Sequence, residues 1–261
     1  MASFSTPAGP FKCAVALAAA LLLCGSAVAN EQPDDRTEPE SLYPMTATYR
    51  ASLDKGIPVK GSATRTLESK GNGQWLYRFD VDSFIADIRE ATYFRWEDDR
   101  VVPNIYRYSL EGMMIPDRHR SIDFNHADNR VSGDYEGDEV NYTVPADALD
   151  PMGYQLQLRQ DLKNGLTEME YEVVDKRHLE TSRFGVVGED VLETKLGKVK
   201  TLKVEKIRAP KKKRTTLMWF APDWDYLLVR LVQVETDGTR YEIHLESAEI
   251  NGKNVSAQTK F

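Results

Sequence analysis

The segment Lys70–Phe84 reads K-G-N-G-Q-W-L-Y-R-F-D-V-D-S-F and decides the fold. Its Asn72-Gly73 pair predicts a two-residue hairpin turn, because a type I′ turn needs positive φ at both central residues. After the turn, large apolar residues occupy every second position: Trp75, Tyr77, Phe79 and Val81. Since strand side chains alternate between two faces, this period of two predicts a strand with one buried face.

The same alternation, broken by short turns, extends on both sides of this hairpin over most of residues 42–251. One segment differs: Asp150-Pro151 opens a run with apolar residues at helical spacing, and Gly165 follows it. Asp at the N-cap and Pro at the first position are typical of a helix start. We therefore predict a mainly β fold, an antiparallel meander that forms a curved sheet, half-barrel or barrel, with one helix near residues 150–164. A sheet split into two lobes near the helix is the alternative.

Residues 1–29 have the features of a secretory signal peptide. Lys12 is their only charge, an apolar run of 12 residues follows, and Ala27-Val28-Ala29 supplies the small residues that signal peptidase requires. The run is too short to cross a bilayer, which takes about 20 residues. We expect cleavage near Ala29 and export to the periplasm. A retained anchor and a lipid attached at Cys24 are the alternatives.

Cleavage there would remove both cysteines and leave 232 residues. Such a chain has no disulfide and no cysteine ligand or nucleophile, and it is long enough to bury a core without them. Residues 30–41 are polar, acidic and contain proline, which predicts a flexible tether. We expect one β-rich domain over residues 42–251 and a polar tail over residues 252–261.

The composition argues against several functions. With 41 acidic and 34 basic residues, the net charge of −7 disfavours a nucleic-acid partner. The sequence contains no G-x-S-x-G, H-E-x-x-H or EF-hand motif. His178-Leu179-Glu180 and His244-Leu245-Glu246 each place two ligand types on one strand face, but a wet strand face gives this pattern by chance. We expect no catalytic residue, no metal, no cofactor and no enzymatic activity.

A basic run is the sharpest charge feature: Lys211, Lys212, Lys213 and Arg214 follow Pro210 at an expected hairpin tip. The functional interpretation is contact with anionic headgroups or with an acidic partner. A solvated turn is the alternative.

Aromatic residues concentrate on the predicted strands. A concave sheet could use them to hold an apolar ligand, and the predicted wall is Trp75, Phe79, Trp96, Tyr106 and Trp219. The apolar loop Met113, Met114 and Ile115 is the predicted rim, because methionine adapts to varied apolar shapes. Plain core packing is the alternative for both sets.

Three stretches resemble the domain-of-unknown-function 3108 (DUF3108) family of exported bacterial proteins. They are the opening strand with its hairpin (Tyr43–Leu53, then Gly61 to Trp75-Leu76-Tyr77), the helix from Leu149-Asp150-Pro151, and the closing hairpin (Thr216–Asp223, then Leu228–Leu231). The stretch W-F-A-P-D at Trp219–Asp223 is the most specific, and Leu228 departs from the family, which tends to carry proline there. The resemblance implies a periplasmic β-rich protein without an established activity, similar in shape to half-barrel lipoprotein carriers.

Two hypotheses follow. In the first, a non-catalytic periplasmic protein holds a lipid, an acyl chain or a lipoprotein segment in a concave sheet, and is not an integral membrane protein once the leader is removed. In the second, an envelope assembly or scaffold protein binds another protein through a sheet edge or the basic hairpin. The first predicts aromatic and aliphatic side chains that face a cavity that no core residue fills. The second predicts a filled core with an exposed apolar patch or an unpaired edge strand.

Overall fold

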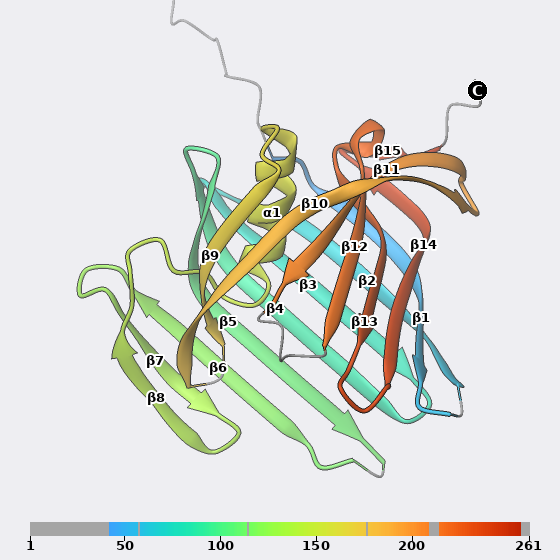
Figure 1. The fold of residues 1–261 in the computed structure, drawn as a ribbon. Helices are drawn as coiled ribbons and strands as arrows, with labels where there is room; N and C mark the ends of the chain where they lie inside the picture. Colours follow the sequence, from blue (N-terminus) through green and yellow to red (C-terminus); the bar gives the residue numbers. More distant parts are fainter. Residues whose placement is uncertain (1–41, 57, 114, 176, 209–213, 257–261) are drawn as a thin grey trace, which may run out of the picture. The chain divides into compact units, whose positions relative to one another are not determined.

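The computed structural model describes residues 42–56, 58–113, 115–175, 177–208 and 214–256, all within one compact unit, Glu40–Phe261. In this part of the chain, one antiparallel sheet of 15 strands curves around the helix α1 (Gly153–Lys163) (Figure 1). The strands are β1 (Met45–Asp54), β2 (Pro58–Gly71), β3 (Gln74–Ser83), β4 (Ala86–Glu97), β5 (Arg100–Gly112), β6 (Arg118–Asn125), β7 (Arg130–Tyr135), β8 (Asp138–Thr143), β9 (Glu168–Asp175), β10 (His178–Thr194), β11 (Gly197–Ile207), β12 (Thr215–Ala221), β13 (Leu227–Val234), β14 (Arg240–Ile250) and β15 (Lys253–Asn254). A short 3-10 helix, η1 (Pro222–Trp224), follows β12. The predicted β meander with one helix is confirmed, as a sheet that does not close.

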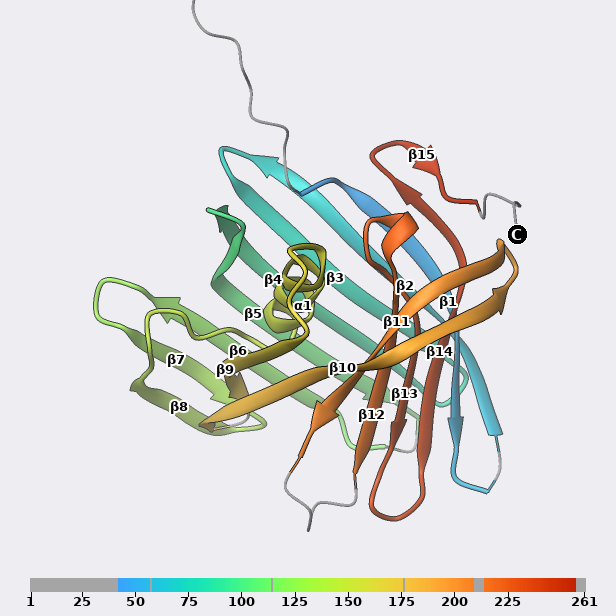
Figure 2. The same ribbon diagram turned by 45° about the horizontal axis from the view of Figure 1, so that its top comes forward.

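Consecutive strands pair with each other, except across α1. One further pairing joins the two ends of the domain: β1 lies beside β14, with Met45 opposite Ile250 and Asp54 opposite Arg240. The order across the sheet is therefore β8 to β1 and then β14 to β9, which leaves β8 and β9 at the two ends. The chain between these end strands forms α1, which lies inside the curve of the sheet (Figure 2).

The segment that leads into α1 covers the end strand β9. The Leu149 N–H donates to the Glu172 carbonyl and the Val174 N–H donates to the Leu149 carbonyl, both at 2.8 Å. These bonds make a single parallel bridge between Leu149 and Val173. An edge strand with paired backbone groups is a poor template for another chain.

The hairpin between β2 and β3 forms as predicted. Asn72 and Gly73 have φ values of 50° and 70°, and the flanking residues pair with each other in the sheet. Trp75 and Tyr77 are each 4% exposed and belong to the hydrophobic core on the inner face of the sheet. The turn therefore sets the register, and the register places the alternating aromatic side chains inside.

α1 is buried on most of its surface. Leu156, Leu158 and Leu162 are at most 2% exposed. Its buried polar residues have partners: the Gln157 side-chain oxygen accepts the Val101 N–H at 2.9 Å. A polar group can lie in a core when a hydrogen bond replaces its bond to water.

Asp150 fixes the start of α1. Its side chain is fully buried, and Oδ1 accepts the N–H groups of Met152 and Gly153 at 2.7 and 2.8 Å. Oδ2 accepts the Thr92 hydroxyl of β4 at 2.7 Å. The carboxylate thus binds free N–H groups at the helix start, as expected of Asp150, but the regular helix begins only at Gly153 because Pro151 and Met152 form a turn before it.

The sheet extends beyond residue 251, the predicted end of the β-rich domain. Asn251 and Gly252 form a turn with φ values of 49° and 70°. Lys253 then pairs with Ile250, so the start of the predicted polar tail is the short strand β15. The physical reason is the turn itself, which returns the chain onto β14.

The predicted signal peptide, residues 1–29, and tether, residues 30–41, lie outside the described residues. Both stay predictions from the sequence.

Replacing Asp150 by alanine leaves two amide N–H groups and one hydroxyl buried without their acceptor. Unmade bonds of this kind cost about 1–3 kcal/mol each, so Asp150→Ala should lower the free energy of unfolding by roughly 3 kcal/mol or more. Asp150→Asn keeps one oxygen for the two N–H groups and should lose clearly less. Urea unfolding measures both variants, and equal losses would contradict the capping role.

Burial raises the pKa of Asp150 above its ordinary value of 3.8. The folded protein therefore holds a proton at pH values where the unfolded chain has released it, and the free energy of unfolding falls as the pH rises from about 3.8 through the raised pKa. Asp150→Asn does not titrate, so its stability relative to the wild type should improve as the pH rises through this range. Urea titrations across the range measure this difference, and a difference that does not change with pH would contradict the raised pKa.

Candidate functional site

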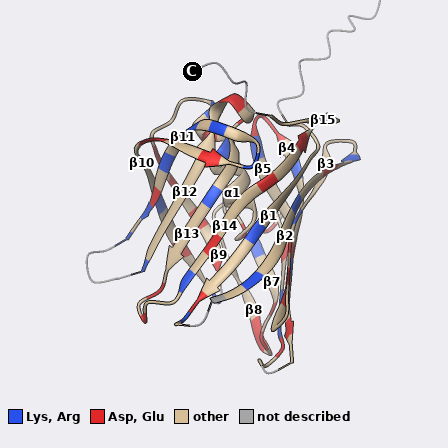
Figure 3. Ribbon diagram, turned by 90° about the vertical axis from the view of Figure 1, so that its right-hand side faces the viewer, with Lys and Arg blue, Asp and Glu red and all other residues tan. Residues whose placement is uncertain are grey.

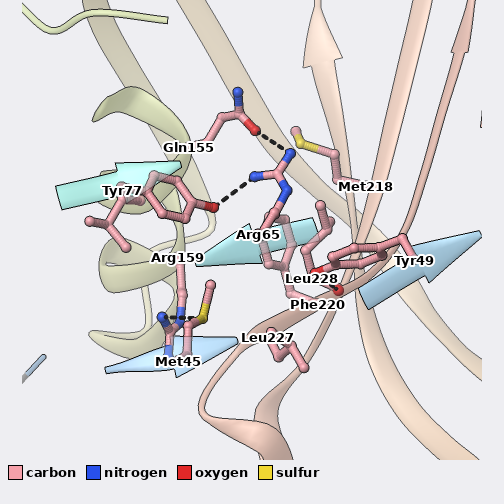
Figure 4. A pocket seen from close by; sticks show the side chains of 11 residues that line it. Met45, Tyr49, Arg65, Tyr77, Gln155, Arg159, Met218, Phe220, Leu227 and Leu228 are labelled. Atoms are coloured by element: carbon pink, nitrogen blue, oxygen red, sulfur yellow. Dashed lines mark hydrogen bonds between the residues drawn. The ribbon is translucent and has the colours of Figure 1, made fainter. Parts of the chain in front are cut away.

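An enclosed cavity of about 20 Å³ lies between α1 and strands β1, β2, β3, β12 and β13 (Figure 4). Its lining is mostly apolar but includes two arginines, Arg65 and Arg159. A cavity of this volume holds about one water molecule. This cavity beneath α1 therefore has no room for a lipid.

The guanidinium of Arg65 is the unusual group at this cavity. It is 3% exposed, donates from Nη1 to the Tyr77 hydroxyl at 2.7 Å, and donates from Nη2 to the Gln155 side-chain oxygen at 2.9 Å. Its Nε has no hydrogen-bond partner, and its Cζ lies 4.5 Å from the centre of the Phe79 ring. By contrast, Arg159 forms an ion pair with Asp225 at 2.5 Å. The Arg65 guanidinium is thus bound by two neutral hydrogen-bond acceptors and by an aromatic ring.

Arg65 begins a row of side chains that crosses six strands on the inner face. In the register from β2 to β7 the members stand opposite one another: Arg65, Phe79, Glu90, Tyr108, Arg120 and Tyr135. We call this set the inner row. Aromatic and charged residues alternate along it, which favours contact between cations and ring faces.

Arg120 shows what this alternation produces. Its Cζ lies 4.4 Å from the Tyr108 ring centre and 4.5 Å from the Tyr135 ring centre, and its guanidinium pairs with Glu136 at 2.6 Å. Cation–π contacts of this kind contribute about 0.5–1 kcal/mol each at exposed sites. The two rings therefore hold the Arg120 guanidinium between them.

Glu90 is the acidic member of the inner row. It accepts the Tyr106 hydroxyl at 2.7 Å. Burial raises the pKa of Glu90 above its ordinary value, and burial followed by the nearby Glu90 charge raises the pKa of Tyr106. The pair forms a partly buried hydrogen bond within the sheet.

A second group of cations faces the inside of the sheet, with Lys206 on β11 and Arg208 directly after its last residue, Ile207. The Lys206 Nζ lies 5.7 Å from the ring centres of both Tyr154 on α1 and Phe184 on β10, and these two rings stack at 5.4 Å. Arg208 donates from Nη2 to the Thr216 hydroxyl at 3.2 Å. Among the described residues, no carboxylate forms a salt bridge with either cation. Burial lowers the pKa of Lys206, and burial followed by the charge of a neighbouring arginine lowers that of Arg208.

Tyr154 lies between these two sets of side chains. Burial raises its pKa to about 12, and charges act on it from both sides: Glu90 and Arg65 on one, Arg208 on the other. The side chains that α1 leaves uncovered are half-buried, and we call them the open inner face: Phe79, Glu90, Tyr108, Arg120, Tyr135, Lys206 and Arg208. This face combines aromatic rings with charges of both signs, because Glu180, half-buried on the same face of β10 as the buried Phe184, acts electrostatically on Lys206 and Arg208.

Four predicted wall residues lie on the inner face, but most of them are core residues. Trp75 and Tyr106 are 4% and 2% exposed and pack in the hydrophobic core, and Trp96 packs against it while partly buried. Phe79 alone belongs to the open inner face. A ligand would therefore meet the open inner face, and not the predicted wall residues Trp75, Trp96 and Tyr106.

Trp219 lies on the outer face, away from the predicted wall. The register places it opposite Arg230 on β13. The same row continues with His244 on β14 and the exposed Arg50 on β1. Its indole N–H donates to the Asp190 carboxylate at 2.8 Å. Charged residues of both signs are interspersed along β12, β13, β14 and β1 (Figure 3). One register position decides the face, and here it turns the indole outward.

The predicted rim and basic tip are described only in part. Met113 is 83% exposed, and Ile115 is partly buried. Arg214 is exposed and pairs with Glu235 at 2.9 Å. The remaining residues of these two sets lie outside the described residues: Met114, Lys211, Lys212 and Lys213.

A larger hollow, of about 370 Å³, lies mainly over the outer face of β3 to β7. Small residues form its floor: Ala91, Ser109 and Ser121. The arginines around it are paired with carboxylates, as when Arg107 meets Asp123 at 2.8 Å. Their charges are already matched, so this hollow offers an anion little net attraction.

The described residues contain no group of three or more His, Cys, Asp or Glu side chains placed to hold a metal ion. None of their helices is long and apolar enough to cross a membrane.

Several solved structures are similar to this chain. The β-barrel-like protein of the domain of unknown function DUF1849 from Brucella abortus has a TM-score of 0.57 at 9% identity, covering 80% of this chain and 98% of that one. At this identity the likeness shows the fold alone.

Two other similar chains have lower TM-scores. A candidate lipoprotein from Parabacteroides distasonis has a TM-score of 0.30 at 15% identity, over 80% of this chain and 96% of that one. A candidate outer membrane lipoprotein-sorting protein domain from Vibrio parahaemolyticus has a TM-score of 0.19 at 10% identity, over 84% and 86%.

No curated protein matches the chain. A family model does match, over residues 46–246, and it covers the opening strand, the helix and the closing hairpin that carried the resemblance. The chain therefore belongs to DUF3108, a family described as proteins of unknown function.

Proposed function

We propose that the protein is a non-catalytic periplasmic binding protein that holds an anionic amphiphile, a lipid or acyl chain with an acidic head, against the open inner face. One observation carries the proposal: Lys206 and Arg208 are half-buried cations that form no salt bridge with a carboxylate among the described residues, and Glu180 acts on both only at longer range. A half-buried charge without a hydrogen-bonded counter-ion is unfavourable. An acidic head placed between the two cations would supply that direct contact.

The apolar part of the ligand has a surface to match. Tyr154, which is partly buried, lies beside Lys206 and stacks on the buried Phe184, and Phe79 and Tyr108 lie on the opposite side of the curve. Aromatic rings next to cations suit a molecule with an apolar body and a negative end. The charged groups here bind one another or aromatic rings, an arrangement that favours binding over the activation of a nucleophile.

The periplasmic part of the proposal rests on residues 1–29 alone, with their short apolar run and small residues before the cleavage point. The scaffold alternative has less support at β9, because the bridge from Leu149 to Val173 already pairs part of that edge.

The cation pair gives a direct test. The double variant K206Q/R208Q should bind oleate about tenfold or more weakly than the wild type, since hydrogen bonds to charged groups contribute about 1.5–3 kcal/mol and 1.4 kcal/mol is tenfold. Methyl oleate, which lacks the charge, should bind both proteins equally. Titration of delipidated protein, followed by isothermal calorimetry, measures the affinities.

The matched control is K198Q/K200Q, which removes two exposed charges from the other end of the same strand. It should bind oleate as the wild type does. Equal oleate affinity in the wild type and K206Q/R208Q, or no oleate binding by the wild type, would contradict the proposal.

A further inference from the structure

Two neighbouring turns carry the most exposed large apolar side chains of the described residues. Phe84, between β3 and β4, is 86% exposed, and Met113, between β5 and β6, is 83% exposed. A single exposed apolar residue is ordinary on a protein surface. Two such residues on adjacent turns form a patch that calls for a partner.

The two turns lie side by side at one end of the sheet (Figure 1). Ala86 and Gly112, the residues that border them, stand opposite each other in the register of β4 and β5. The contact is close, because a Cβ added to Gly112 would lie 2.8 Å from the Ile85 carbonyl oxygen. Phe84 and Met113 therefore belong to one surface, which we call the apolar tip.

An apolar path joins the apolar tip to the open inner face. Val81, Ile88 and Leu110 stand opposite one another on β3, β4 and β5, one row closer to the turns than the inner row. All three are partly buried. The next positions along β3 and β5 on the same face are Phe79 and Tyr108. Apolar surface thus continues from the tip into the proposed binding face.

The size of the apolar tip argues against a protein partner. A stable protein interface buries about 800 Å² on each side, whereas an aromatic side chain buries about 150–250 Å² and the tip has two large side chains. A bilayer needs no complementary shape and accepts single apolar side chains at its surface.

The charges around the apolar tip determine which kind of bilayer it can contact. Four exposed acids flank the two turns, Asp82, Asp87, Glu111 and Asp117, against two arginines: Arg89, which pairs with Asp82 at 2.5 Å, and the exposed Arg118. The excess of negative charge would repel an anionic surface, and it would also repel the same tip on a second copy of this chain. A bilayer of zwitterionic lipid carries no net charge and avoids both costs.

We propose that Phe84 and Met113 insert into the surface of a zwitterionic bilayer and so bring the open inner face close to the lipid. Hydrophobic burial provides the attachment, so it does not weaken as salt rises. The inference stands apart from the proposed function, since a bilayer contact at the tip needs neither Lys206 nor Arg208.

Co-sedimentation with phosphatidylcholine vesicles tests this surface. The full-length protein should partition onto the vesicles equally at low and high salt. F84D/M113D should partition about tenfold or more weakly, because attachment scales with the apolar area buried. Both side chains are almost fully exposed, so this variant should fold, and its oleate affinity should match that of the wild type.

The control V187D/V191D changes two other exposed apolar residues, 51% and 57% exposed on β10, and should keep vesicle binding. Three results would overturn the inference: equal partition of wild type and F84D/M113D, binding that requires anionic lipid, or a dimer in solution that F84D/M113D abolishes without any vesicle binding by the wild type. If K206Q/R208Q loses oleate binding but keeps vesicle binding, the ligand site and the bilayer contact are supported independently of each other.

Discussion

Burial of one short helix inside a curved sheet is the constraint on which the rest of this structure depends. The apolar side chains of α1 face strands from both halves of the sheet, and Asp150 fixes its start by binding two N–H groups and the Thr92 hydroxyl of β4. The sheet does not close on itself, and the segment before α1 pairs with one of its end strands, β9, through the bridge from Leu149 to Val173. A single buried carboxylate thus links the start of the helix to β4 of the sheet.

The length of α1 also explains why a binding face exists. Eleven helical residues extend about 16 Å, whereas the 13 residues of β5 extend about 40 Å. The helix therefore covers only part of the inner face. On the remainder, aromatic rings support a cation: Tyr108 and Tyr135 enclose Arg120. A surface of this composition is stable beside water and remains suited to an amphiphile.

Local signals in the sequence predicted the hairpin at Asn72-Gly73, the helix and the family, because each depends on residues close together in the chain. The position of Trp219 could not be predicted, since one register position turns its side chain to the other face. The inner row was missed for a related reason: its members come from six strands, and only the register places Arg65 beside Phe79. The pairing of β1 with β14 likewise joins segments about 200 residues apart, for which the sequence carries no short-range signal.

Native mass spectrometry of the protein, exported with its own leader and purified without detergent, tests the central claim most directly. The account predicts a discrete added mass that extracts into organic solvent and ionises as an anion, with the same mass absent from protein that lacks the charges of Lys206 and Arg208. A wild-type protein that carries no added mass, or one whose extracted ligand is uncharged, would contradict the claim that the open inner face holds an anionic amphiphile.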